Sequence, residues 1–143
     1  MKIDSFTGNY RWLSNFASAD VVLDGVHYAS VEHAYQAAKT NVKEERMQIR
    51  SCPTAGRAKQ LGRHVTMRSD WHAVKLDVMY ELVKQKFNNN VALASMLRGT
   101  GDAELEEGNY WNDTYWGVCK GKGENHLGKI LMRVRKELNE HQQ

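Results

Sequence analysis

The chain has 143 residues, of which 41% are hydrophobic, and a net charge of +3 at pH 7. This length fits one domain, and the composition, with its single proline, excludes a disordered or collagen-like chain. No apolar run is long enough to cross a bilayer and no signal-peptide core follows Met1, so we expect a cytoplasmic protein without a membrane partner. Cys52 and Cys119 lie far apart in the sequence. We therefore expect both to be reduced and to pack as small hydrophobic residues, rather than to form a disulfide framework or a zinc cluster.

Charge is distributed unevenly along the sequence. Residues 43–75 carry eight Lys or Arg, whereas residues 102–113 carry five acids and no base. A basic stretch can attract phosphate, but it is equally typical of solvated helix faces. Charge alone therefore does not predict a nucleic-acid-binding protein.

The N-terminal part is expected to be β and loop, with a tight hairpin in which Asp24 and Gly25 join residues 21–23 to residues 26–28. Ser30 is a suitable N-cap for a helix whose apolar residues Val31, Ala34, Tyr35 and Ala38 fall at helical spacing. Short helices are predicted over residues 44–50 and 54–61.

The longest helix is predicted over residues 70–88, and its wide apolar face implies a central position. A shorter helix should cover residues 91–97, and loop or short strand should cover residues 104–117. The last helix is expected to begin near Asn125 and to pack through Leu127, Ile130, Leu131, Val134 and Leu138.

The helix after Ser30 carries the residues most suggestive of chemistry. Glu32 and Lys39 should project within about 20° of each other, roughly 10 Å apart along the helix axis, beside the Tyr35 edge of the apolar stripe. Gln36 should lie slightly further round, and His33 is expected to face solvent. The carboxylate and amine could line one cleft, or they could be the polar flank of an ordinary amphipathic helix.

Aromatic side chains gather in polar, glycine-containing segments. Tyr110, Trp111, Tyr115 and Trp116 surround Asp113, and rings in such loops can stack a nucleobase. Trp71 shares a stripe with apolar helix residues, so it could be a core residue or a stacking residue. Residues 121–128 form a glycine-rich opening to the last helix, where exposed amides could hold phosphate.

Two common kinds of catalytic site are not indicated. The six histidines show neither an H-E-x-x-H pattern nor Cys/His ligand spacing, and no serine lies in a G-x-S-x-G elbow. We therefore expect neither a metal nor another cofactor, and no serine nucleophile.

A series of short sequence motifs, distributed over nearly the whole chain, resembles the motifs of the NADAR (NAD- and ADP-ribose-related) domain family, also called YbiA-like proteins. The resemblance implies one domain over residues 1–143 with an α+β fold, predominantly helical with a small antiparallel sheet. The motifs lie at residues 11–16, 28–39, 58–63, 68–71, 86–87, 100–102, 113–117 and 123–128.

The resemblance implies an N-glycosidase that cleaves a base from a phosphorylated ribose or ADP-ribose. Substrates associated with the family are ribosylamino-pyrimidine phosphates of early riboflavin synthesis and ADP-ribosylated guanine, including guanine within DNA or RNA. Implied catalytic residues are Glu32, Asp113 and, as a covalent nucleophile, Lys39. Implied substrate-binding residues are Asn15, Phe16, Tyr35, Gln36, Arg63, Trp71, Trp116, Gly117 and Asn125.

These residue types suit the chemistry. Cleaving a ribose C–N bond builds positive charge on the sugar, which carboxylates stabilise, while an acid helps the base to depart. An amine kept neutral by an apolar wall could instead attack the anomeric carbon and form a Schiff base. Two other readings remain: a non-catalytic nucleotide or ADP-ribose sensor, and a nucleic-acid-binding module whose affinity would fall steeply with salt.

Overall fold

The backbone is mostly helical in the computed structural model, which describes residues 1–141. Contacts divide the chain into two units. We call residues 15–86 the hairpin unit, and residues 1–14 together with the chain from residue 87 onward the terminal unit. Each is described by itself.

The hairpin unit begins with two antiparallel strands, β2 (Ser18–Leu23) and β3 (Val26–Ser30). Asp24 and Gly25 join them with φ angles of 50° and 81°. A two-residue turn with both φ values positive matches the right-handed twist of the strands, so the Asp-Gly pair fixes this hairpin as predicted. Val21 and Tyr28 on the hairpin are buried.

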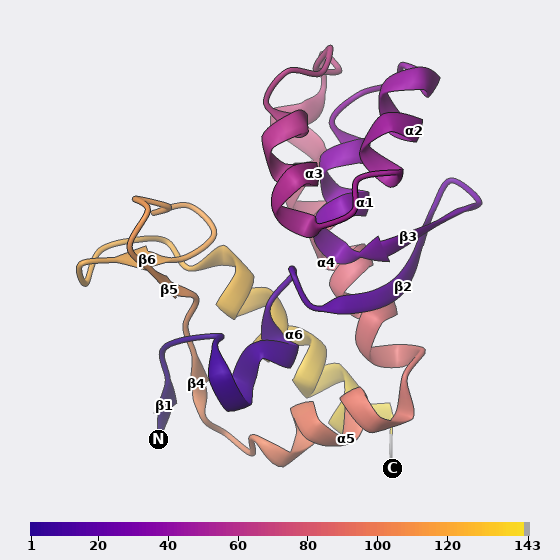
Figure 1. Cartoon of the computed structure of the whole chain (residues 1–143). Coiled ribbons are helices and arrows are strands. Elements are labelled where there is room, and N and C mark those ends of the chain that lie inside the picture. Colours follow the sequence, from indigo (N-terminus) through magenta and orange to yellow (C-terminus); the bar gives the residue numbers. More distant parts are fainter. Residues whose placement is uncertain (142–143) are drawn as a thin grey trace. The chain divides into compact units, whose positions relative to one another are not determined.

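Three short helices follow the hairpin: α1 (Val31–Ala38), α2 (Lys43–Arg50) and α3 (Ala55–Gly62). Ser30 caps α1 by accepting a hydrogen bond from the amide of His33, and Thr54 caps α3 in the same way through Arg57. Both α2 and α3 pack on α1 (Figure 1). Because β2 and β3 also contact α1, all eight of its residues are buried.

Helix α4 (Trp71–Asn88) is the longest helix of the described chain. It begins in the hairpin unit, where Trp71, Met79, Leu82 and Val83 are buried, and its last two residues belong to the terminal unit. Gln85 bonds both the amide and the carbonyl of Val22, each at 2.8 Å, which ties α4 to the hairpin.

The terminal unit contains short elements around one amphipathic helix, α6 (His126–His141), whose residues Leu127, Ile130, Leu131 and Val134 are buried. Asn90 caps α5 (Val91–Gly99), and two parallel strand pairs complete the unit. Its other elements are β1 (Lys2–Ile3), the 3-10 helix η1 (Gly8–Leu13), α5 (Val91–Gly99), β4 (Glu104–Leu105), β5 (Gly108–Asn109) and β6 (Val118–Cys119).

The predicted α+β class is confirmed, and every predicted helix forms within a few residues of its expected bounds. The 3-10 helix η1 was not predicted. The antiparallel sheet is the hairpin, whereas the pairs β1–β4 and β5–β6 are parallel. Within residues 1–141, no helix combines the length and the apolar character that crossing a bilayer requires. The single domain over residues 1–143 stays a prediction.

Candidate functional site

The candidate site is built on α1, which carries Glu32 and Gln36 and ends at its C-cap residue, Lys39. Glu32 is 7% exposed, and its Oε2 accepts a hydrogen bond of 2.6 Å from Nε2 of Gln36, one helical turn further on. The Glu32 amide donates to the carbonyl of Asn15 at 3.1 Å, which holds the start of the helix. Lys39 is half-buried.

The Gln36 side chain donates a hydrogen bond to Glu32 through its amide nitrogen, and its amide oxygen packs closely against Gly62. Its Oε1 has no hydrogen-bond partner within residues 1–141. A Cβ added at Gly62 of α3 would collide with that oxygen, so the glycine makes room for the Gln36 amide. The predicted substrate-binding Gln36 is therefore placed to orient the Glu32 carboxylate.

Burial moves the ionisation of Glu32 and Lys39 in opposite directions. It raises the pKa of Glu32, opposed by the Gln36 hydrogen bond and by the positive charges of Lys59 and Lys39. It lowers the pKa of Lys39, opposed by Glu32, while Arg63, Lys59 and Lys75 lower it further by repulsion. The carboxyl thus retains its proton to a higher pH than usual, and the amine loses its proton at a lower one.

Aromatic rings lie beside two lysines of the site, Lys39 and Lys59. The Tyr35 and Trp71 rings are 5.1 Å apart between centroids, and Nζ of Lys39 is 5.9 Å from the Tyr35 centroid. Nζ of Lys59 is 5.8 Å from the centroid of Phe16. Trp71 is only 3% exposed, as a core residue would be, but its contact with Tyr35 places it on the wall beside Lys39.

Two predicted binding residues of the hairpin unit have different surroundings. Arg63, the C-cap residue of α3, is exposed, and its charge acts on Lys39. Asn15 is 8% exposed, and its Nδ2 lies 3.3 Å from Sδ of Met79. Arg63 is thus accessible to an anionic ligand, whereas Asn15 supports α1 through its backbone carbonyl.

The expectation that His33 faces solvent is wrong. His33 is 3% exposed, with Nδ1 2.7 Å from Oγ of Ser30 and Nε2 3.0 Å from the carbonyl of Cys52. Both ring nitrogens have a partner, so burial leaves neither unsatisfied. Packing of α2 and α3 on α1 covers the face that the helical spacing assigned to solvent.

The predicted residues Asp113, Trp116 and Gly117 lie in one loop of the terminal unit. Oδ1 of Asp113 accepts from the amides of Tyr115 and Trp116 at 3.1 and 2.9 Å. The Trp116 ring packs edge-on against Tyr115, and Gly117 is buried where a Cβ would meet Glu107. One oxygen of the predicted catalytic Asp113 therefore shapes the loop that carries Trp116.

The glycine-rich start of α6 does not offer the open amides that were expected to hold phosphate. The amides of Asn125, His126 and Leu127 donate to the carbonyls of Gly117, Tyr115 and Trp116, at 3.3, 3.1 and 3.0 Å. This expectation is corrected, because the preceding loop already satisfies the helix start.

Asn125, a predicted substrate-binding residue, has both ends of its side-chain amide engaged. Its Nδ2 donates to the Leu105 carbonyl at 2.9 Å, and its Oδ1 accepts from the Glu107 amide at 3.0 Å. With a φ of 54°, it also turns the chain into α6. Asn125 therefore joins β4 to the helix start.

Lys59 and Lys75 are site residues that the sequence interpretation did not select. Both are half-buried, and both act electrostatically on Lys39. Lys59 lies within the motif at residues 58–63, one helical turn before Arg63, so this spacing could have identified it.

Elsewhere in the hairpin unit, a wide-open cavity of about 680 Å³ lies along β2, β3 and the end of α2. None of the predicted site residues lines it, and its Asp20 and His27 form an exposed pair with each other at 2.8 Å. Within residues 1–141, no three His, Cys, Asp or Glu side chains are grouped closely enough to hold a metal ion.

The chain is similar over most of its length to known proteins of one family. The model of the NADAR domain matches residues 4–139. The N-glycosidase YbiA of Escherichia coli is 35% identical over 94% of this chain and 85% of its own length, and an N-glycosidase of Nostoc punctiforme is 38% identical over 90% and 86%. The solution structure of E. coli YbiA superposes with a TM-score of 0.87 at 33% identity, covering 99% of this chain and 86% of that one.

A riboflavin biosynthesis protein of Vibrio vulnificus is 38% identical over 93% of this chain, which spans only 37% of that protein. Fold and relatives together define the class of protein, an α+β enzyme of the N-glycosidase type. The chain belongs to the NADAR domain family.

Proposed function

We propose that this enzyme hydrolyses the C–N glycosidic bond between a base and a phosphorylated ribose or ADP-ribose. One observation carries the proposal: Glu32 and Lys39 project from one helix, and burial pushes their pKa values in opposite directions. Paired groups shifted in this way are typical of acid and nucleophile assignments in enzymes. A non-catalytic ADP-ribose or nucleotide module would need neither shift.

In the proposed reaction, the neutral Lys39 amine attacks the anomeric carbon as the C–N bond to the base breaks. The base leaves with that bond's electron pair and takes a proton from Glu32. The ring oxygen then departs from the carbon and takes one proton of the amine nitrogen, and the second proton of that nitrogen returns to Glu32, which leaves an imine. Water hydrolyses this imine, releasing the sugar and restoring Lys39.

The positive charges around Lys39 suit a phosphorylated sugar. Arg63 is exposed and can pair with phosphate, and Lys59 and Lys75 add charge nearby. Tyr35 and Trp71 supply an aromatic wall for the base. The name of the Vibrio vulnificus relative supports a ribosylamino-pyrimidine phosphate as substrate, and ADP-ribosylated guanine, free or in DNA or RNA, is the second candidate.

The deciding assay incubates the enzyme with ADP-ribosylated guanosine, ADP-ribosylated DNA and a ribosylamino-pyrimidine phosphate, and identifies the released bases by mass. Glu32→Gln should slow turnover by about 10²- to 10⁴-fold, because it keeps the shape of the side chain but removes the proton donor. Release of no base from any of the three would refute the proposal.

Borohydride added during turnover should trap a covalent adduct at Lys39, and Lys39→Arg should abolish both the adduct and turnover. Lys43→Arg, the same change at an exposed lysine of α2, is the matched control and should leave both intact. A nearly active Lys39→Arg enzyme without an adduct would instead establish direct attack by water.

Glu32→Gln also has a signature in stability. Because burial raises the pKa of Glu32, its ionisation destabilises the fold progressively as pH rises from about 4.5 toward the folded-state pKa. The Glu32→Gln variant has no such ionisation. Its free energy of unfolding, measured relative to that of the wild type, should therefore increase over that pH range and then level off. Urea titrations across pH measure it, and an advantage that shrinks with rising pH would contradict the burial of the charge.

A further inference from the structure

The chain that follows Lys39 is held by a side chain from α2. Thr40 is fully buried, and its Oγ1 donates to Oε1 of Glu45 at 2.6 Å. The same carboxylate accepts from the Thr66 amide at 2.9 Å and from the Thr66 hydroxyl at 3.0 Å. Glu45 therefore joins the end of α1 to a segment more than twenty residues further along the chain.

That second segment holds Lys39 and Trp71 directly. Met67 pairs with Thr40 in an antiparallel bridge, and the Arg68 amide donates to the Lys39 carbonyl at 2.7 Å. The Arg68 carbonyl in turn accepts from the Trp71 amide at 3.2 Å. Lys39 and Trp71, which both lie near the Tyr35 ring, are thus held by one short stretch of chain.

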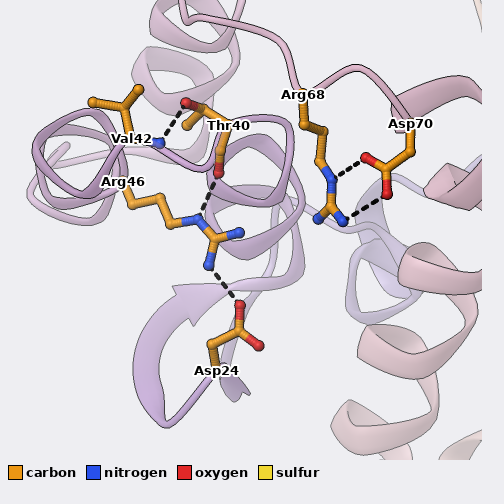
Figure 2. A network of polar contacts seen from close by, with 6 residues as sticks. All are labelled: Asp24, Thr40, Val42, Arg46, Arg68 and Asp70. Carbon is orange, nitrogen blue, oxygen red and sulfur yellow. Dashed lines mark hydrogen bonds and ion pairs between the residues drawn. The ribbon is translucent and has the colours of Figure 1, made fainter.

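Arginine side chains complete the arrangement. Figure 2 shows Nε of Arg46 donating to the Thr40 carbonyl at 2.7 Å and its other end bonding Asp24 at 2.6 Å. Arg68 makes two bonds to Asp70, at 2.6 and 3.0 Å, in the turn before α4. Among these groups, Glu45 is the one whose carboxylate bonds both Thr40 and Thr66.

We propose that Glu45 is a positioning residue for the reaction, whose three hydrogen bonds lock the Lys39 backbone and keep its amine against the Tyr35 and Trp71 wall. The inference rests on the proposed function, since it assigns Glu45 a role in the chemistry of Lys39. Lysine has four rotatable side-chain bonds, so a fixed backbone is required for a fixed amine. A carboxylate provides two acceptor oxygens for three donors, whereas a glutamine side chain has one acceptor oxygen and an amide nitrogen that only donates.

The same hydrogen bonds lower the pKa of Glu45, chiefly the bond from Thr40, so the carboxylate stays ionised as an acceptor at neutral pH. Glu44, its neighbour in the first turn of α2, is exposed. The chain therefore offers a matched pair of glutamates that differ in this contact.

The test compares Glu45→Gln with Glu44→Gln. Competitive acetylation of the intact enzyme over a range of pH, read by mass spectrometry, reports the reactivity of the Lys39 amine. In Glu45→Gln the titration of Lys39 should move up toward its ordinary value of 10.5, because a loosened amine reaches water. Turnover should fall about 10- to 100-fold in kcat with little change in KM. Glu44→Gln should match the wild type in all three measurements.

Labelling separates this inference from the proposed function. A shifted Lys39 titration in Glu45→Gln supports the positioning role even if Lys39→Arg proves active, in which case only the covalent step fails. An unchanged titration in a folded Glu45→Gln protein overturns the role. Should that variant not fold, Thr66→Val removes one of the three bonds and should shift the titration in the same direction by less; no shift would overturn the role.

Discussion

Gly62 gives a quantitative test of how closely Gln36 is packed behind Glu32. In Gly62→Ala, the new Cβ would meet Cδ of Gln36 at 2.7 Å and its Cβ at 3.1 Å, as well as its Oε1. Rotating the terminal amide alone cannot relieve contacts that reach back to the Cβ of Gln36. The whole side chain must move, and its bond to Glu32 should weaken or break.

The expected magnitude follows from two opposing terms. Alanine stabilises a helix relative to glycine by about 0.5–1 kcal/mol, while an overpacked core costs about 1–3 kcal/mol. Gly56→Ala, in the same helix, places its Cβ 3.9 Å from Thr54 and meets nothing closer, so it carries only the favourable term. Gly62→Ala should therefore be about 1–3 kcal/mol less stable than Gly56→Ala.

Urea unfolding and turnover assays of both variants make the measurement. The Gln36 bond becomes a bond to a charged group as Glu32 gives up its proton, and such a bond is worth about 1.5–3 kcal/mol. Gly62→Ala should therefore lose about 10- to 150-fold in kcat while Gly56→Ala keeps wild-type activity. Adding Gln36→Ala should remove most of the stability penalty of Gly62→Ala. Equal stability and activity of the two alanine variants would refute the packing argument.

Two further predictions concern metals and Trp71. Activity should survive chelation of divalent ions, because the proposed chemistry uses only a carboxyl group and an amine; loss of turnover restored by adding back one metal would contradict this. Trp71→Leu should lower the stability of the fold by about 1–3 kcal/mol, less than truncation of a buried Trp to alanine costs, since the ring is 3% exposed and leucine fills part of its space. It should also weaken substrate affinity. Unchanged affinity in the folded variant would show that Trp71 is only a core residue.

The sequence predicts the elements that local rules determine. The Asp24-Gly25 turn and the cap at Ser30 each depend on a few neighbouring residues, and each forms as expected. The electrostatic effect of Glu32 and Lys39 on each other also agrees with their spacing, because seven residues bring a side chain back to nearly the same face of a helix.

What spacing cannot predict is what packs against a helix. His33 has the position of a solvent-facing residue on an isolated α1, yet Ser30 and the distant Cys52 carbonyl enclose it. The charge of Lys59, on the separate helix α3, lowers the pKa of Glu32. The glycine-rich segment before α6 was expected to expose amides, but its partners come from the chain some ten residues earlier. Each error concerns a contact between elements.

The two carboxylates proposed for catalysis differ in their bonding, and this difference separates their roles. Glu32 accepts one side-chain bond, is buried, and has a raised pKa, which are the properties of a group that holds and delivers a proton. Asp113 uses one oxygen to accept two backbone amides, which fixes the loop that carries Trp116. The proton required by the departing base is therefore assigned to Glu32, and the fixed position of Trp116 to Asp113.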